Sequence, residues 1–186
     1  DKGYAPQHLE DGAFTGLSVE GAQLRLTDGR PATHLSVDQG VSDIVVFDLP
    51  PSTTEIQPAL AFGVSAHASS TWADQAPRWL RVLGYAPRRI TDTAALVVAR
   101  TIAMIVNEAA DAVCQGVCTE RDADQAMKLG ANYPAGPFEW LDRWGAGRIV
   151  TLIDHLDAHY RGERYRVSSA LRHRAWTASA FARETR

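Results

Sequence analysis

The stretch Met127 to Gly145, "MKLGANYPAGPFEWLDRWG", places glycines, prolines and aromatic residues close together and decides how the second half of the chain folds. Gly130 is expected to let the chain leave a helix with a positive φ, because glycine has no side chain to clash. Pro137 is expected to open the next helix, where its fixed φ suits the first turn. The stretch holds no nucleophile beside a base, so its residue types favour a structural corner over a catalytic loop.

Helical patterns surround this corner. The segment 91–116 repeats apolar residues every three or four positions, which is typical of a helix that buries one face. Its opposite side is largely apolar as well, so we expect burial on more than one face. Thr119, with Asp122 three positions later, forms a variant of the capping box and predicts the start of another helix. Further amphipathic patterns follow, so residues 91–186 are predicted to be all helical.

The residues before 91 have a different character. Residues 1–17 are polar and unpatterned and are expected to form a tail or linker. The alternation of Leu24 and Leu26 with polar residues predicts one strand, and the β-branched apolar run 44–47 predicts a second. The stretch 59–67 is similar and predicts a third, and the segment 71–83 predicts a helix that is stopped at Gly84. A last strand is expected around Arg89. The alternation of strands with a helix indicates a small α/β layer over 18–90, followed by the helical part, and the fold class is therefore α+β.

Composition excludes several classes of protein. The chain has 186 residues, of which 45% are hydrophobic and 22% charged, and its net charge is −3. This is ordinary globular composition, and a nucleic-acid binder would usually be strongly basic. No apolar run approaches the roughly 20 residues of a membrane helix, so no membrane partner is expected. Cys114 and Cys118 are expected to be reduced thiols in a cytoplasmic protein. The chain begins at Asp1, which suggests a piece of something longer.

The order and spacing of motifs in the second half resemble those of a known family. Asn107-Glu108-Ala109 lies in the long helix, Asp124-Gln125-Ala126-Met127 in the next, and the corner follows the pattern G-x-P-x-G-P-F-x-x-x-D-x-x-G. This combination resembles the C-terminal helical domain of 3-hydroxyacyl-CoA dehydrogenases over about residues 82–176. The positions that match the family's motifs are Arg100, Asn107, Glu108, Gly130, Pro134, Gly136, Pro137, Phe138, Asp142 and Gly145.

The resemblance implies an NAD-dependent oxidation of (S)-3-hydroxyacyl-CoA to 3-oxoacyl-CoA, in phenylacetate or fatty acid catabolism. The likeness is greatest to long bacterial members of phenylacetate catabolism that act on 3-hydroxyadipyl-CoA and carry two such helical domains in tandem. In the family a preceding Rossmann domain holds NAD in a G-x-G-x-x-G turn and supplies the catalytic histidine–glutamate pair. No such turn occurs here, so residues 18–90 are interpreted as a degenerate Rossmann-like remnant, and NAD is expected only in an upstream domain.

Ala99 departs from the family pattern, because the resemblance implies an asparagine there, near the substrate. His67 also lacks the family's sequence context, so no residue of this chain is assigned a catalytic role. The chain then supplies either a wall of the acyl-CoA cleft or a pseudo-dimer module without substrate contact, and it is expected to be inactive alone. Its expected partners are the upstream domains of its own chain and a second copy in a homodimer. Candidates for the dimer interface are Val98, Ile102 and Ile105.

Two further constellations have a structural and a functional interpretation. Asn107 and Glu108 interrupt an apolar helix, and a structural pair closed by Arg100 or by backbone groups is favoured over a catalytic one. His155 and His159 lie four positions apart and could face one metal ion. Because the sequence places no third ligand beside them, a solvated helix face is favoured and no metal site is predicted.

Overall fold

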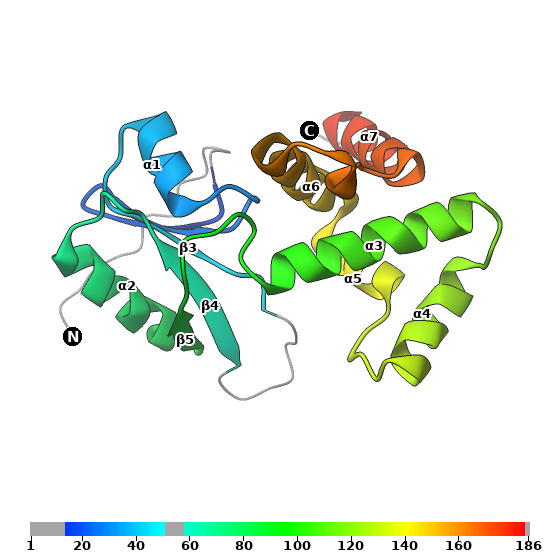
Figure 1. Cartoon of the computed structure of the whole chain (residues 1–186), viewed down its shortest axis with the longest axis horizontal. Coiled ribbons are helices and arrows are strands. Elements are labelled where there is room, and N and C mark those ends of the chain that lie inside the picture. The colour runs from blue at the N-terminus through cyan, green and yellow to red at the C-terminus, as the bar shows by residue number, and fades with distance from the viewer. Residues whose placement is uncertain (1–13, 51–57, 185–186) are drawn as a thin grey trace. The chain divides into compact units, whose positions relative to one another are not determined.

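The computed structural model describes residues 14–50 and 58–184, and the chain divides into two compact units, one up to Val98 and one from Ala99 onward (Figure 1). The expected division was at residue 91. The predicted tail lies mostly outside the described residues, but its last positions belong to a strand. Each unit has its own secondary structure and its own core.

The first unit is built on a mixed sheet whose strands lie in chain order. β1 and β2 are antiparallel, β2 and β3 parallel, β3 and β4 antiparallel, and β4 and β5 parallel. One helix follows β2 and another follows β4, so the unit consists of two β–α–β crossovers joined back to back. The elements are β1 (Gly16–Val19), β2 (Ala22–Leu26), α1 (Ala32–Gln39), β3 (Ile44–Phe47), β4 (Ala59–Val64), α2 (Ser70–Val82) and β5 (Ala86–Arg89). The predicted α/β layer is confirmed.

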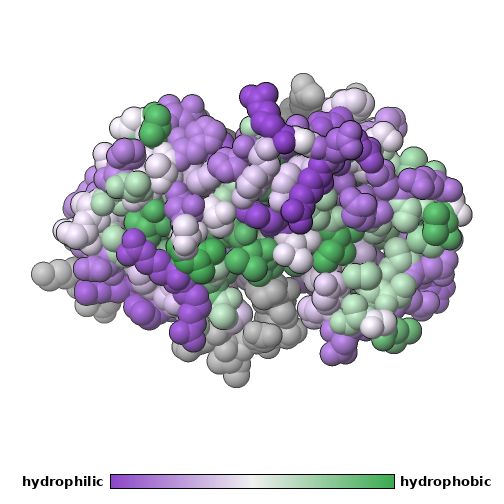
Figure 2. Space-filling view, in the orientation of Figure 1, coloured by the Kyte–Doolittle hydropathy of each residue, from purple (hydrophilic) through white to green (hydrophobic). Residues whose placement is uncertain are grey.

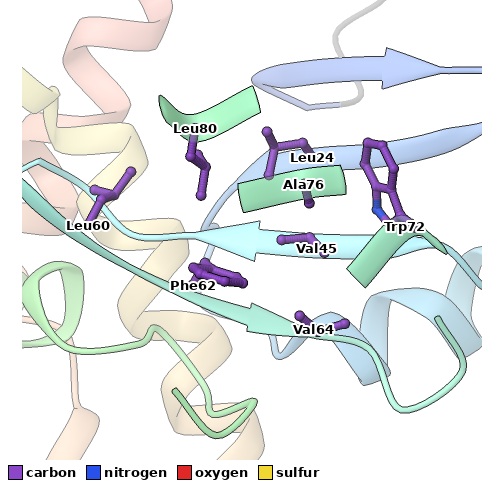
Figure 3. Packing of buried hydrophobic residues seen from close by; sticks show 8 residues of the cluster. All are labelled: Leu24, Val45, Leu60, Phe62, Val64, Trp72, Ala76 and Leu80. Atoms are coloured by element: carbon purple, nitrogen blue, oxygen red, sulfur yellow. The ribbon is translucent and has the colours of Figure 1, made fainter. Parts of the chain in front are cut away.

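The sheet buries apolar side chains on both faces because successive residues of a strand point to opposite sides. Val45 packs with the α2 residues Trp72, Ala76 and Leu80, as Figure 3 shows. Its neighbours Ile44 and Val46 pack on the other face, under α1. The two helices therefore cover opposite faces of the sheet, as Figure 1 also shows.

Two elements of this unit were not predicted from the sequence. β1 overlaps the end of the expected tail and pairs antiparallel with β2. α1 is a short helix of eight residues whose N-cap, Pro31, makes no side-chain cap hydrogen bond. Only three of its residues are buried, so it lacks the long apolar repeat by which a helix is recognised.

The second unit is all helical, as predicted. Its elements are α3 (Val98–Cys114), α4 (Glu120–Gly130), α5 (Pro137–Trp144), α6 (Ala146–Tyr160), a 3-10 turn η1 (Glu163–Tyr165) and α7 (Ser169–Glu184). Its core includes Phe138 and Leu141 from α5, Ile153 and Leu156 from α6, and Leu171 from α7. Within the described ranges, no helix is both long and apolar enough to cross a bilayer.

The long helix begins later than its apolar pattern predicted. Ala95 and Leu96 have positive φ angles of 56° and 52°, so they lie outside the helix. Leu96 instead packs with the α1 residues Ala32 and Leu35 in the first unit. The predicted helical segment 91–116 therefore extended too far toward the N-terminus, because Leu96 lies before α3. An apolar residue fits a helix face and a loop that covers a core equally well, so periodicity could not distinguish the two.

Candidate functional site

The corner between α4 and α5 is held by one carboxylate from α4. The Asp124 Oδ1 accepts a hydrogen bond from the backbone amide of Phe138 at 2.7 Å, in the first turn of α5. A Cβ atom on Gly136 would lie 2.3 Å from the same oxygen, so residue 136 has no room for a side chain. Pro137 is the first residue of α5, where proline fits without losing a helical hydrogen bond.

Glu139 adds a second connection between the two helices. Its Oε2 accepts a hydrogen bond from the Gly136 amide at 3.0 Å, and its Oε1 accepts one from the Lys128 ammonium of α4. The hydrogen bond from Lys128, followed by that from the Gly136 amide, lowers the pKa of the Glu139 carboxyl. These contacts hold the backbone at the start of α5 against α4.

The remaining motif positions near the corner have varied surroundings, and the backbone of one of them differs from the prediction. Gly130 is the last residue of α4 and lacks a positive φ, and the left-handed residue is Asn132, with φ 54°. That part of the prediction for Gly130 was wrong, because an asparagine can also adopt this conformation. Pro134 is exposed. Asp142 pairs with Arg174 of α7 at 3.1 Å, and Gly145, with φ 82°, separates α5 from α6.

Asn107 is a buried polar bridge. Its side chain is 1% exposed, its Nδ2 donates to the Arg166 carbonyl at 3.0 Å, and its Oδ1 accepts from the Ser168 amide at 2.8 Å. Backbone groups thus satisfy it, which is one of the two closures expected. Glu108 beside it is exposed, and the Arg100 guanidinium donates to the Tyr160 hydroxyl at 2.9 Å. Asn107 therefore positions the chain that leads into α7.

An apolar groove lies beside the corner. It has a volume of about 430 Å³ and is lined by residues of α3, α4 and the start of α5. These are Met104, Ile105, Glu108, Ala109, Ala123, Ala126, Met127 and Pro137. Glu108 is the one charged residue among them, so the groove offers an apolar surface and a single carboxylate.

One wall of the groove, α4, is poorly covered by its own chain. None of its residues is buried, although α4 carries Ala126, Met127 and Leu129. Leu129 is 85% exposed. Figure 2 shows the green, apolar area over α4 and the neighbouring part of α3. Exposed apolar surface of this kind marks contact sites in soluble proteins.

The three candidate interface residues are in different surroundings. Ile105 lines the groove, and Val98 is half-buried. Ile102 is only 5% exposed in the single chain. It lies on the same side of α3 as Ala103 and Val106, which face the unit's interior. The expectation that Ile102 belongs to a free face therefore differs from the structure, whereas Ile105 remains a candidate.

His67 and His159 were weighed from the sequence as catalytic or metal-binding residues. In the portion of the chain that the structure describes, no three His, Cys, Asp or Glu side chains gather as metal ligands. His159 is exposed and stacks edge-on against Tyr160. His67 is exposed, and its backbone amide donates to the Ser65 hydroxyl at 3.1 Å. The groove can hold apolar surface, but it presents no pair of groups for proton transfer.

The sequence did not predict the contacts at the start of α1, the helix that follows β2 in a β–α–β unit. In a dinucleotide-binding β–α–β unit the pyrophosphate lies against the N-terminus of the first helix, after a glycine-rich turn. Here the amides of Ala32 and Thr33 donate to the two oxygens of the Asp92 carboxylate at 2.7 and 2.8 Å. These residues do not fit a bound pyrophosphate.

Each of the two units matches a model of the same protein family. Residues 24–93 match the family model described as 3-hydroxybutyryl-CoA dehydrogenase reduced Rossmann-fold domain. Residues 96–185 match the one described as 3-hydroxyacyl-CoA dehydrogenase, C-terminal domain. The chain belongs to the 3-hydroxyacyl-CoA dehydrogenase family, which confirms the resemblance inferred from its motifs.

Individual relatives agree with this assignment. The chain is 33% identical over 178 residues to 3-hydroxyadipyl-CoA dehydrogenase of Escherichia coli K12. The aligned residues make up 96% of this chain and 36% of that protein. It is 38% identical over 74 residues to human mitochondrial hydroxyacyl-coenzyme A dehydrogenase. These aligned residues make up 40% of this chain and 24% of the human protein. The crystal structure of 3-hydroxybutyryl-CoA dehydrogenase from E. coli superposes with a TM-score of 0.84 at 33% identity, over 95% of this chain and 36% of that one. The chain thus spans about a third of the length of these E. coli relatives.

Proposed function

We propose that this chain is the C-terminal part of an NAD-dependent dehydrogenase that oxidises (S)-3-hydroxyacyl-CoA to 3-oxoacyl-CoA. The observation that carries the proposal is the match to the E. coli 3-hydroxyadipyl-CoA dehydrogenase, which takes in 96% of this chain but only 36% of that protein. The remaining length is where a complete Rossmann domain would hold NAD and where the catalytic pair would lie.

The substrate class is a coenzyme A thioester with a 3-hydroxy group. The names of the relatives differ in the acyl chain, adipyl in one case and butyryl in another, and they share the 3-hydroxyacyl-CoA part. The proposal commits to this shared part and places the reaction in phenylacetate or fatty acid catabolism. The proposal also places the enzyme in the cytoplasm, where the thiols of Cys114 and Cys118 would stay reduced.

Within such an enzyme, the proposed role of this chain is association. Ala99 has no polar group with which to contact a substrate, and it is fully buried. The exposed apolar residues of α4 and the groove beside it need a partner surface. A second copy of the helical unit, in a homodimer or in tandem within a longer chain, would supply that surface. These observations favour the pseudo-dimer module over a wall of the substrate cleft.

The test is an assay of NADH formation from a 3-hydroxyacyl-CoA, run with this chain alone and with the longer protein that contains it. We expect turnover from the longer protein and none from this chain. Turnover by the chain alone near the usual enzyme median of about 10 per second would overturn the proposal. Absence of turnover in both, across adipyl and butyryl substrates, would overturn the assigned reaction.

A further inference from the structure

The turn between β2 and α1 joins a strand to a helix inside a parallel β–α–β unit, as the phosphate-binding turn of a dinucleotide-binding fold does. β2 and β3 are parallel, and α1 is the crossover between them. A helix N-terminus that follows such a strand binds anions, because its amides are unpaired and its dipole is positive there. If this unit took a dinucleotide in the usual way, its phosphates would contact the first amides of α1.

Those amides already have an anionic partner from a distant part of the chain. Asp92 lies 60 residues after Ala32, and its two oxygens each accept one hydrogen bond, from Ala32 at 2.7 Å and from Thr33 at 2.8 Å. Charge-assisted hydrogen bonds of this length are among the stronger ones in proteins. α1 otherwise has no side-chain cap and no acidic residue in its first turn.

The backbone around Asp92 is fixed on both sides. The Ile90 amide donates to the Phe62 carbonyl at 3.0 Å, and the Ala95 amide donates to the Gly29 carbonyl at 3.0 Å. Asp92 passes close over β4 at Gly63, where an added Cβ atom would lie 2.9 Å from Oδ1 and 3.2 Å from Cα of Asp92. Gly63 thus leaves the space that the carboxylate needs.

Other groups at the turn are also engaged. Arg30, the nearest cation in sequence, pairs with Asp28 at 2.6 Å and with Asp38 at 3.1 Å. The Thr33 hydroxyl accepts a hydrogen bond from the Ala66 amide at 2.9 Å. An incoming phosphate would have to displace one carboxylate from the helix and compete with two others for the arginine.

We infer that Asp92 occupies, from inside the chain, the anion position at the start of α1, and that this unit therefore binds no dinucleotide there. The inference deepens the proposed function, in which NAD is held outside this chain, and it names the group that closes the site. Asp92 supplies a negative charge at the N-terminus of α1, where such a charge stabilises a helix.

The test follows the backbone amides of Ala32 and Thr33 by two-dimensional ¹H–¹⁵N NMR during titrations with NAD⁺ and with inorganic phosphate. In the unmodified chain we expect no saturable shift of either amide with either ligand. In Asp92→Ala we expect saturable shifts of both amides with phosphate, because the position is then open. Asp92→Asn should melt at a lower temperature than the control Asp38→Asn, which removes an exposed charge of the same helix.

Saturable shifts of Ala32 and Thr33 with NAD⁺ in the unmodified chain would overturn the inference, and so would a folded Asp92→Ala chain whose amides ignore phosphate. If Asp92→Ala does not fold, Asp92→Asn decides, and a melting temperature equal to that of Asp38→Asn would refute the role of Asp92. None of these outcomes depends on turnover. The inference about Asp92 can therefore fail while the proposed reaction stands, and the proposed reaction can fail while the inference stands.

Discussion

Asp48 holds the beginning of α3, since its Oδ2 accepts a hydrogen bond from the Val98 amide at 2.7 Å. The same oxygen accepts from the Val97 amide at 2.9 Å, and Oδ1 accepts from Leu49 at 2.8 Å. Asp48 is fully buried at the end of β3. It thereby fixes where the long helix starts, after the positive-φ pair at residues 95 and 96.

Replacing Asp48 by alanine should destabilise the chain. The amides of Val97 and Val98 would lose their carboxylate acceptor, and a hydrogen bond to a charged group contributes about 1.5–3 kcal/mol. Asp38→Ala is the control, because Asp38 is half exposed in its pair with Arg30, and such pairs contribute about 0–1 kcal/mol. Urea unfolding of both variants measures the difference. Equal midpoints would show that Asp48 does not cap α3.

Asn107→Ala should also lower the free energy of unfolding. It would leave the buried Ser168 amide without its acceptor, at about 1–3 kcal/mol, and would remove the hydrogen bond to the Arg166 carbonyl. The neighbouring change Glu108→Ala, at an exposed position, serves as the control and should stay within about 0.5 kcal/mol. Thermal unfolding followed by circular dichroism compares the two. A variant at 107 no less stable than the one at 108 would contradict the bridge.

Much of the fold was predictable where its cause is local. The strand at 44–47 has the predicted bounds, and the capping box of Thr119 and Asp122 is present, because both depend on residues close in sequence. The helix start at Pro137 was predicted for the same reason.

The parts that were missed depend on contacts between distant residues. Asp48 and Asp92 cap helices that begin 50 and 60 residues away, and no periodic pattern relates a carboxylate to so remote an amide. The groove was missed for a similar reason, since it depends on how α4 lies beside α3. The motif Asp124 was recognised, but its contact with Phe138 needed the structure.

Gly136→Ala should weaken the corner. The new methyl group would lie within 2.4 Å of the Asp124 side chain, and relieving such a clash costs about 1–3 kcal/mol. Gly147→Ala is a matched control inside α6, where nothing lies within 4 Å of the added atom. That change should raise stability by about 0.5–1 kcal/mol, because alanine favours a helix over glycine. Opposite signs in chemical denaturation are expected, and a neutral Gly136→Ala would count against the tight corner.

The corner should also respond to acid. The Lys128 hydrogen bond lowers the pKa of Glu139 below its ordinary value of 4.5 in the folded chain. A carboxyl with a lowered folded pKa stabilises the fold above its unfolded pKa and loses that contribution as the pH falls through the folded pKa. Glu139→Gln should therefore flatten the fall of melting temperature below pH 4.5, and so should Lys128→Met. Parallel pH curves for all three chains would disprove the contribution of this pair.

The final prediction is that the chain forms a two-fold symmetric dimer through α4 and the groove. Ala126 and Leu129 are exposed, and the groove on the same side is apolar apart from Glu108. A two-fold axis would bring the same patch from two copies together, which is the usual geometry of homodimers. Sedimentation at micromolar concentration should give a species of twice the 20.3 kDa of one chain.

Leu129→Asp should convert this dimer to a monomer without unfolding it, because Leu129 is 85% exposed in the single chain. Val82→Asp is the control: Val82 is 76% exposed on α2 of the other unit, and the change should leave the dimer intact. Ile102→Asp would be a poor test, because a charge at a 5% exposed residue disrupts the fold itself. A single 20.3 kDa species in the unmodified chain would refute the dimer. A dimer that survives Leu129→Asp would place the interface away from α4.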